Sequence, residues 1–171
     1  LLDSAALGTQ YVVAAQGCSI GEGSQVAIHA TQDGTAVTFT PKGGAPINVN
    51  LNAGETYKYA GSSTDLTGSS VSSNKNVAVF GGHECAQVPV GVAFCDTILE
   101  QMIPTDKLSK TYVLAATKGS QLAFSASDLV RVIATVDGTE VTVDGVVVAT
   151  LNKGEVYEYS LPANNGSIIS A

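Results

Sequence analysis

The sequence is poor in charge, and above all in positive charge. Only 13% of its 171 residues are charged, and eight Lys and Arg stand against fifteen Asp and Glu, for a formal net charge of −7. Nucleic-acid phosphates and anionic lipid surfaces are bound by clustered basic side chains, whereas the basic residues here are scattered singly. We therefore expect no nucleic-acid partner and no docking on an anionic membrane.

Long apolar runs are also lacking. No stretch approaches the roughly 20 apolar residues of a membrane-spanning helix, so we expect no membrane insertion. With 44% hydrophobic residues and low charge, the chain is expected to fold rather than remain disordered. It starts at Leu1 without a Met and stops at Ala171 within an apolar stretch, and we expect it to be a piece of a longer protein.

An internal repeat is the most informative feature of the sequence. Three blocks recur in the same order with offsets of 100 to 104 residues. On this register the pair Ile168 and Ile169 falls near residues 70–72, so the second copy stops before the counterpart of residues 76–81. The matched blocks are 11–15 with 112–116, 30–35 with 134–139, and 51–59 with 151–159.

Each copy predicts four consecutive β-strands joined by short turns. Asp-Gly, the pair preferred in type I′ hairpins, stands between the first two strands at positions 33–34 and 137–138. The first strand of each set is apolar on both faces and is predicted to lie inside its sheet. The fourth alternates charged and aromatic residues, and Glu55 and Glu155 at its start are expected to be solvated. The predicted strands are 25–31, 35–40, 47–51 and 55–60, then 129–136, 139–143, 146–151 and 155–161.

These patterns predict an all-β fold of repeated four-stranded antiparallel meanders. Meanders with an apolar inner strand and an amphipathic outer strand favour β-propeller-like blades, and two tandem β-sandwich domains are the alternative. The expected division is residues 1–104 for the first copy and residues 105–171 for the second, which is truncated before its last strands. Between the meanders, residues 97–103 fit either a strand or a short helix.

Three ordered motifs resemble the N-terminal domain of the IgGFc-binding protein family. They are Asp-Leu-Thr-Gly at 65–68, Gly-x-x-Cys-Ala-x-Val-Pro at 82–89, and Cys-Asp followed by Glu-Gln-x-x-Pro within 95–104. With the neighbouring repeat blocks, the resemblance covers residues 47–160. It implies a domain of secreted, mucus-associated or surface-attached multidomain proteins, found in animals and microbes, whose role is binding or adhesion rather than catalysis. It brings no agreed ligand residues.

The cysteines acquire a meaning from this resemblance. Cys85 and Cys95 flank a loop of nine residues, and the family match implies that they form a disulfide in an oxidising compartment, with two free thiols as the alternative. A loop of this size would give the disulfide a stabilising effect of about 2–3 kcal/mol. Cys18 is left over, either free or paired with a part outside this chain.

The sequence contains few residue patterns that indicate a metal site or a catalytic site. The potential ligands His83, Glu84, Cys85, Cys95 and Asp96 include adjacent residues that would face opposite sides of a strand, and there is no Cys-x-x-Cys or His pair. The Asp-Gly turns hint at calcium, but the dipeptide suits a hairpin turn equally well and no Asp-x-Asp-x-Asp run accompanies it. We expect no metal, no cofactor and no enzymatic activity.

The leading interpretation is therefore a non-catalytic extracellular binding or adhesion module of a larger secreted or cell-surface protein, with a protein or glycan ligand. The alternative is a structural subunit of an extracellular assembly or fibre, completed by strand pairing with another copy or another part of the parent protein. The open-edge strand is expected at Ile168 and Ile169. Asn165 begins an Asn-Gly-Ser glycosylation sequon.

Overall fold

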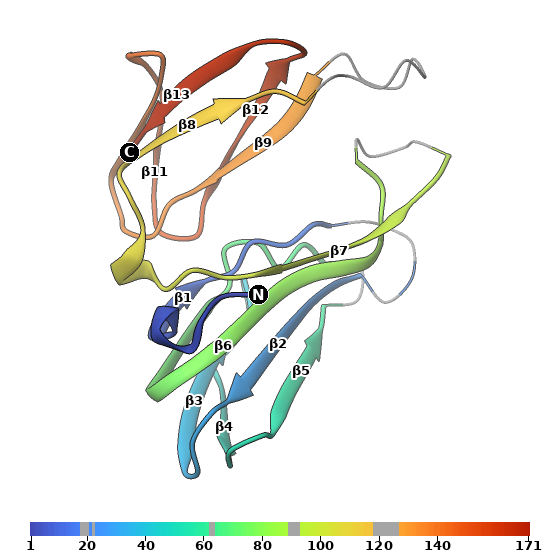
Figure 1. Cartoon of the computed structure of the whole chain (residues 1–171), viewed down its shortest axis with the longest axis vertical. Coiled ribbons are helices and arrows are strands. Elements are labelled where there is room, and N and C mark those ends of the chain that lie inside the picture. Colours follow the sequence, from blue (N-terminus) through green and yellow to red (C-terminus); the bar gives the residue numbers. More distant parts are fainter. Residues whose placement is uncertain (18–20, 22, 62–63, 89–92, 118–126) are drawn as a thin grey trace. The chain divides into compact units, whose positions relative to one another are not determined.

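The computed structural model describes all residues except 18–20, 22, 62–63, 89–92 and 118–126 (Figure 1). The described chain is built of β-strands and two short 3-10 helices, which confirms the all-β class. It divides into two compact units, Leu1–Gln87 with Phe94–Leu108, and Ser109–Ala171 with Val88–Ala93. The first unit contains η1 (Ser4–Ala6), β1 (Gly8–Val12), β2 (Ser24–Ala30), β3 (Thr35–Thr40), β4 (Ile47–Leu51), β5 (Thr56–Ala60), β6 (Ser70–Ala86), β7 (Asp96–Gln101) and η2 (Thr105–Lys107). The second contains β8 (Thr111–Ala115), β9 (Ser127–Ile133), β10 (Thr139–Val143), β11 (Val146–Leu151), β12 (Val156–Pro162) and β13 (Gly166–Ser170).

The 17-residue strand β6 organises the first unit. Along one side, residues 70–73 pair with β3 and residues 77–83 pair with β2, giving the order β4-β3-β6-β2-β5. Along its other side, β6 pairs first with β1 and then with β7. The strand therefore joins two ribbons, β3–β4 and β2–β5, and carries β7 at its C-terminal end (Figure 1).

One apolar core fills the first unit. Residues of β2 are buried alternately, as expected for a strand with one face inside. Phe39 of β3 and Tyr59 of β5 come from different ribbons, and their ring centroids are 5.1 Å apart. Both ribbons thus face the same core. Its fully buried members are Tyr11, Val13, Val26, Ile28, Val37, Phe39, Leu66, Val71, Val77, Val79 and Met102.

The predicted order of a four-stranded meander is wrong. β2 pairs with β5 and β6, and β3 pairs with β4 and β6, although the Asp-Gly turn joins β2 directly to β3. The reason is that the turn leads the chain from the β2–β5 ribbon to the β3–β4 ribbon instead of closing a hairpin, and we call it a corner. The corner is held beside the β4–β5 turn, because Ala53 N–H donates to Asp33 Oδ1 at 2.9 Å. The propeller-like blades are not confirmed, because they depended on the meander. In the first unit the two ribbons are joined through β6 into one seven-stranded sheet that faces a single core, so the alternative of two tandem β-sandwich domains stays a prediction.

The second unit repeats these pairings. β9 pairs with β12 as β2 does with β5, and β10 pairs with β11 as β3 does with β4. The corner repeats too, since Lys153 N–H donates to Asp137 Oδ1 at 2.9 Å. β13 lies between β8 and β10, as residues 70–73 lie between β1 and β3. The predicted open edge therefore does not lie at Ile168 and Ile169, because both sides of their strand are occupied.

The two glutamates predicted to be solvated have a structural role. The carboxylate of Glu55 accepts a hydrogen bond from Asn52 N–H at 2.6 Å, and that of Glu155 accepts one from Asn152 N–H at the same distance. Each glutamate thus closes the turn before its own strand with a charge-assisted hydrogen bond. The repeat extends from the strand order to individual turn contacts.

Candidate interaction site

The disulfide lies where β6 and β7 end their pairing. Cys85 belongs to β6, Cys95 immediately precedes β7, and their Cα atoms are 4.9 Å apart, within the range of protein disulfides. The predicted bond between Cys85 and Cys95 is confirmed. Residues 97–103, which fitted either a strand or a helix, begin in strand β7. The disulfide joins the two strands beyond the last regular pair, His83 with Ile98, and holds β7 against β6.

Two glycines let other main-chain segments approach β6 very closely. A Cβ atom on Gly82 would lie 2.1 Å from the carbonyl oxygen of Ile98 in β7. A Cβ atom on Gly81 would lie 2.1 Å from the carbonyl oxygen of Ala14. Both distances are far shorter than a van der Waals contact. Gly-Gly is therefore required at this point of the motif for the packing of β6 between its neighbours.

His83 is a structural residue of this hairpin. Its ring is only 2% exposed, and Nδ1 accepts a hydrogen bond from Cys85 N–H at 2.9 Å. This bond assigns the proton of the neutral ring to Nε2, and within the described residues Nε2 has no hydrogen-bond partner. No group of three or more His, Cys, Asp or Glu that could hold a metal ion is found in the described part of the chain.

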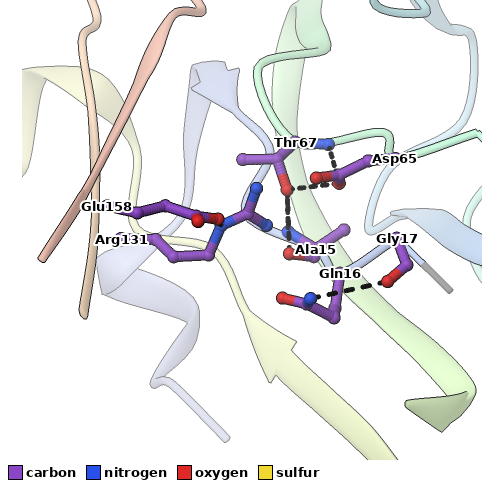
Figure 2. Close-up of polar contacts among 7 residues, drawn as sticks. All are labelled: Ala15, Gln16, Gly17, Asp65, Thr67, Arg131 and Glu158. Atoms are coloured by element: carbon purple, nitrogen blue, oxygen red, sulfur yellow. Dashed lines mark hydrogen bonds and ion pairs between the residues drawn. The ribbon is translucent and has the colours of Figure 1, made fainter. Parts of the chain in front are cut away.

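The Asp-Leu-Thr-Gly motif fastens the segment that follows β1. The Asp65 carboxylate accepts from Thr67 N–H at 2.9 Å and from Thr67 Oγ1 at 2.7 Å, as Figure 2 shows. Thr67 Oγ1 also contacts Ala15, at 2.8 Å from its carbonyl oxygen and 3.1 Å from its nitrogen. Leu66 between them is buried, and its N–H donates to Ser24 Oγ at 3.2 Å. The motif is a clamp that joins three segments of the first unit.

Figure 2 also draws a polar pair within the second unit. Arg131 of β9 and Glu158 of β12 are directly opposite each other in the ladder, with Nε and Oε1 3.1 Å apart. Opposite charges at such positions stabilise the pairing of two strands. The pair adds to the stability of this register of β9 and β12.

The exposed side of the hairpin is apolar and acidic. Phe94 is 76% exposed, Leu99 is 68% exposed and Ile98 is 37% exposed. Asp96 and Glu100 are also exposed, and residues 94–102 contain no Lys or Arg. The sequence motifs therefore lead to one structural feature, a disulfide-anchored edge strand with solvent-exposed leucine, isoleucine and carboxylates.

Burial raises the pKa of the Tyr11 hydroxyl above its ordinary value. A hydrogen bond from Gly8 N–H acts in the opposite direction, and the charge of Asp106 adds to the increase. The hydroxyl accepts from Gly8 N–H at 2.8 Å and donates to the carbonyl oxygen of Val77 at 2.6 Å. Tyr11 thus serves the core of the first unit, joining β1 to β6.

The glycosylation sequon at Asn165, the cysteine Cys18 and one nucleophile-like pattern lie away from the disulfide hairpin in the sequence. Asn165 is exposed in the turn between β12 and β13, and Ser167 of the same sequon is buried, with its hydroxyl 3.2 Å from that of Tyr159. Cys18 lies outside the described residues. It is part of Gly-Cys-Ser-Ile-Gly at 17–21, which matches the nucleophile pattern of α/β-hydrolases. That pattern requires a strand-turn-helix, and the residues that the structure describes contain no α-helix.

Comparison with known proteins gives a consistent result. A family model described as "IgGFc binding protein" matches residues 1–171. The human protein named IgGFc-binding protein is 32% identical over 170 residues, a match that covers 91% of this chain and 3% of the human protein. The chain therefore spans a small part of that relative's length. No solved structure matches. None of the helices among the described residues has the length and apolar character needed to traverse a bilayer.

Proposed function

The chain belongs to the IgGFc-binding protein family, and on this premise we propose that it is a non-catalytic, protein-binding module of a secreted or cell-surface protein. The observation that carries the proposal is the exposed edge strand β7, anchored by the disulfide between Cys85 and Cys95. Exposed apolar side chains on a rigid strand are typical of a protein-interaction surface.

An enzyme is the weaker reading of the same residues. The thiols at positions 85 and 95 are joined, so neither is available as a nucleophile. His83 is buried, and its Nδ1 is occupied by a backbone N–H. These residues hold the hairpin together, which supports a role in presenting a surface rather than in proton or group transfer.

An extracellular location is supported by the disulfide. Structural disulfides persist in oxidising compartments, and a bond that closes a short loop of an edge strand would be lost in a reducing cytosol. The exposed Asn165 offers a glycosylation acceptor if the chain is secreted by a cell that carries out that modification.

Binding can be tested first with the ligand in the relative's name. The purified 171-residue chain is immobilised, and human IgG Fc and a purified mucin are passed over it in a surface plasmon resonance experiment. Saturable binding of either ligand, lost when the chain is heat-unfolded, is the expected result. Absence of saturable binding to both ligands, in a chain that is folded by circular dichroism, would contradict the proposal.

A further inference from the structure

β7 is an edge strand whose outer main chain is unpaired within the described residues. It pairs only with β6, in a register where Gly82 faces Leu99 and Gly81 faces Glu100. Met102 N–H donates to the carbonyl oxygen of Val79 at 2.8 Å, which fixes the alternation of the ladder. Because alternate residues of an antiparallel edge strand direct their N–H and C=O groups outward, those of Leu99 point away from β6.

The two glycines also leave two residues of β7 without a cross-strand side chain. Leu99 and Glu100 lie directly opposite residues that have no side chain, so neither gains the contact that normally stabilises a pair on one face of a sheet. The edge strands β4 and β5 differ, because their aliphatic and aromatic residues are partly buried against the core. β7 is therefore the edge of the first unit at which an added strand would supply the missing neighbours.

The two faces of β7 have different chemistry. Successive side chains of a strand point to opposite faces, so Asp96, Ile98 and Glu100 share one face, whereas Leu99 lies on the other. A partner strand that alternates basic and apolar residues would place its cations beside the two carboxylates and its apolar side chains beside Leu99. A second copy of this chain fits less well, because each copy carries a net charge of −7.

We propose that the outer edge of β7 binds an extended segment of a partner protein, with alternating basic and apolar residues, by antiparallel strand addition. Main-chain hydrogen bonds to the outward groups supply affinity, and the charge of Asp96 and Glu100 selects the partner's register. The disulfide at Cys95 presents the strand in a fixed position, which lowers the entropic cost of binding. This proposal names the site of the binding function proposed above and rests on it.

The test uses a defined peptide rather than an unknown ligand. The peptide has six residues, Lys-Val-Lys-Val-Lys-Val, with capped ends and a fluorescein label. It is titrated with the whole chain, and binding is followed by fluorescence anisotropy. Leu99→Lys is expected to weaken binding on the order of tenfold or more, because it removes the apolar contact and adds a repelling charge. The matched control is Val113→Lys, which adds the same charge at an 80% exposed position of edge strand β8.

A second peptide separates strand pairing from simple charge attraction. It carries an N-methyl group on every residue, so it has the same charges but has no main-chain N–H to donate to a ladder from either of its edges. Weak binding of this peptide, together with selective loss in Leu99→Lys, supports the proposal. Equal binding of both peptides, or equal effects of the Leu99 and Val113 variants, would overturn it. Because both positions are exposed, the variants are expected to fold, and circular dichroism spectra are recorded to check this.

The failure of this proposal differs from a failure of the proposed function. If the chain binds IgG Fc or mucin but not the alternating peptide, the binding function stands and β7 is not its strand-addition site. If the chain binds neither protein nor peptide, both proposals fail. If Leu99→Lys instead abolishes a concentration-dependent dimer seen by analytical ultracentrifugation, a second copy occupies the edge and the assignment of a basic partner is wrong.

Discussion

Replacing Gly82 by Ala tests the packing on which the candidate site depends. The new Cβ atom would lie 2.1 Å from the carbonyl oxygen of Ile98, so β6 and β7 must move apart by more than about 1 Å to restore an ordinary contact. Overpacking against main chain costs about 2–4 kcal/mol, and the reduced flexibility of the unfolded chain returns about 0.5–1 kcal/mol. The net loss in the free energy of unfolding is expected to be about 1–3.5 kcal/mol.

Urea unfolding monitored by circular dichroism measures this loss, and hydrogen exchange locates it. Because the chain has two units, the exchange of peptides from β6 and β7 is the decisive readout, and those of β8–β13 should keep their protection. The matched control is Gly44→Ala in an exposed loop, where the nearest atom is a Pro41 side-chain carbon at 3.2 Å. If Gly82→Ala costs no more than Gly44→Ala, the close approach of β7 to β6 is not real.

Three further changes test the disulfide, the repeated turns and the buried tyrosine. Cys85→Ala should lower the free energy of unfolding of the first unit by about 2–3 kcal/mol relative to the oxidised chain, and should have no effect in excess reductant. Glu55→Ala and Glu155→Ala should each cost about 0.5–1.5 kcal/mol in urea unfolding, and clearly unequal effects would argue against equivalent turns. Because the pKa of Tyr11 is raised in the folded state, stability should fall as the pH rises above the ordinary tyrosine value of 10.0. Tyr11→Phe should reduce that alkaline loss, while costing about 1–2 kcal/mol at neutral pH because the Val77 carbonyl loses its donor, and an unchanged alkaline profile would contradict the assignment.

The sequence allowed the strands to be placed, but not their neighbours. Alternation and β-branched runs determine which residues of a strand face the core, and the positions of β2–β5 and β9–β12 follow from that. Pairing depends on contacts far apart in the sequence, such as Ala27 with Phe80, about which local patterns say nothing. The Asp-Gly turn was a misleading signal, because the same two residues that close a hairpin also turn a corner between two ribbons.

The candidate site was predictable only in part, because local sequence patterns do not show which strands lie at the edge of a sheet. The disulfide between Cys85 and Cys95 followed from the family motif and is found. The edge character of β7 could not be predicted, because an exposed Leu99 and a buried leucine look alike in a sequence. The signal that could have helped is Gly81-Gly82, since two glycines inside a strand indicate close main-chain approach and remove cross-strand side chains.

The two units share a set of paired strands, and the candidate site is built beyond that set. The first half of β6 has its counterpart in β13, with corresponding neighbours on both sides. The second half of β6 carries Gly81-Gly82, the disulfide and the pairing with β7. The shared strands therefore act as a scaffold, and the exposed, acidic edge strand is held by the part of β6 that extends past them. A ligand that recognises β7 should accordingly depend on residues outside the shared part of the repeat.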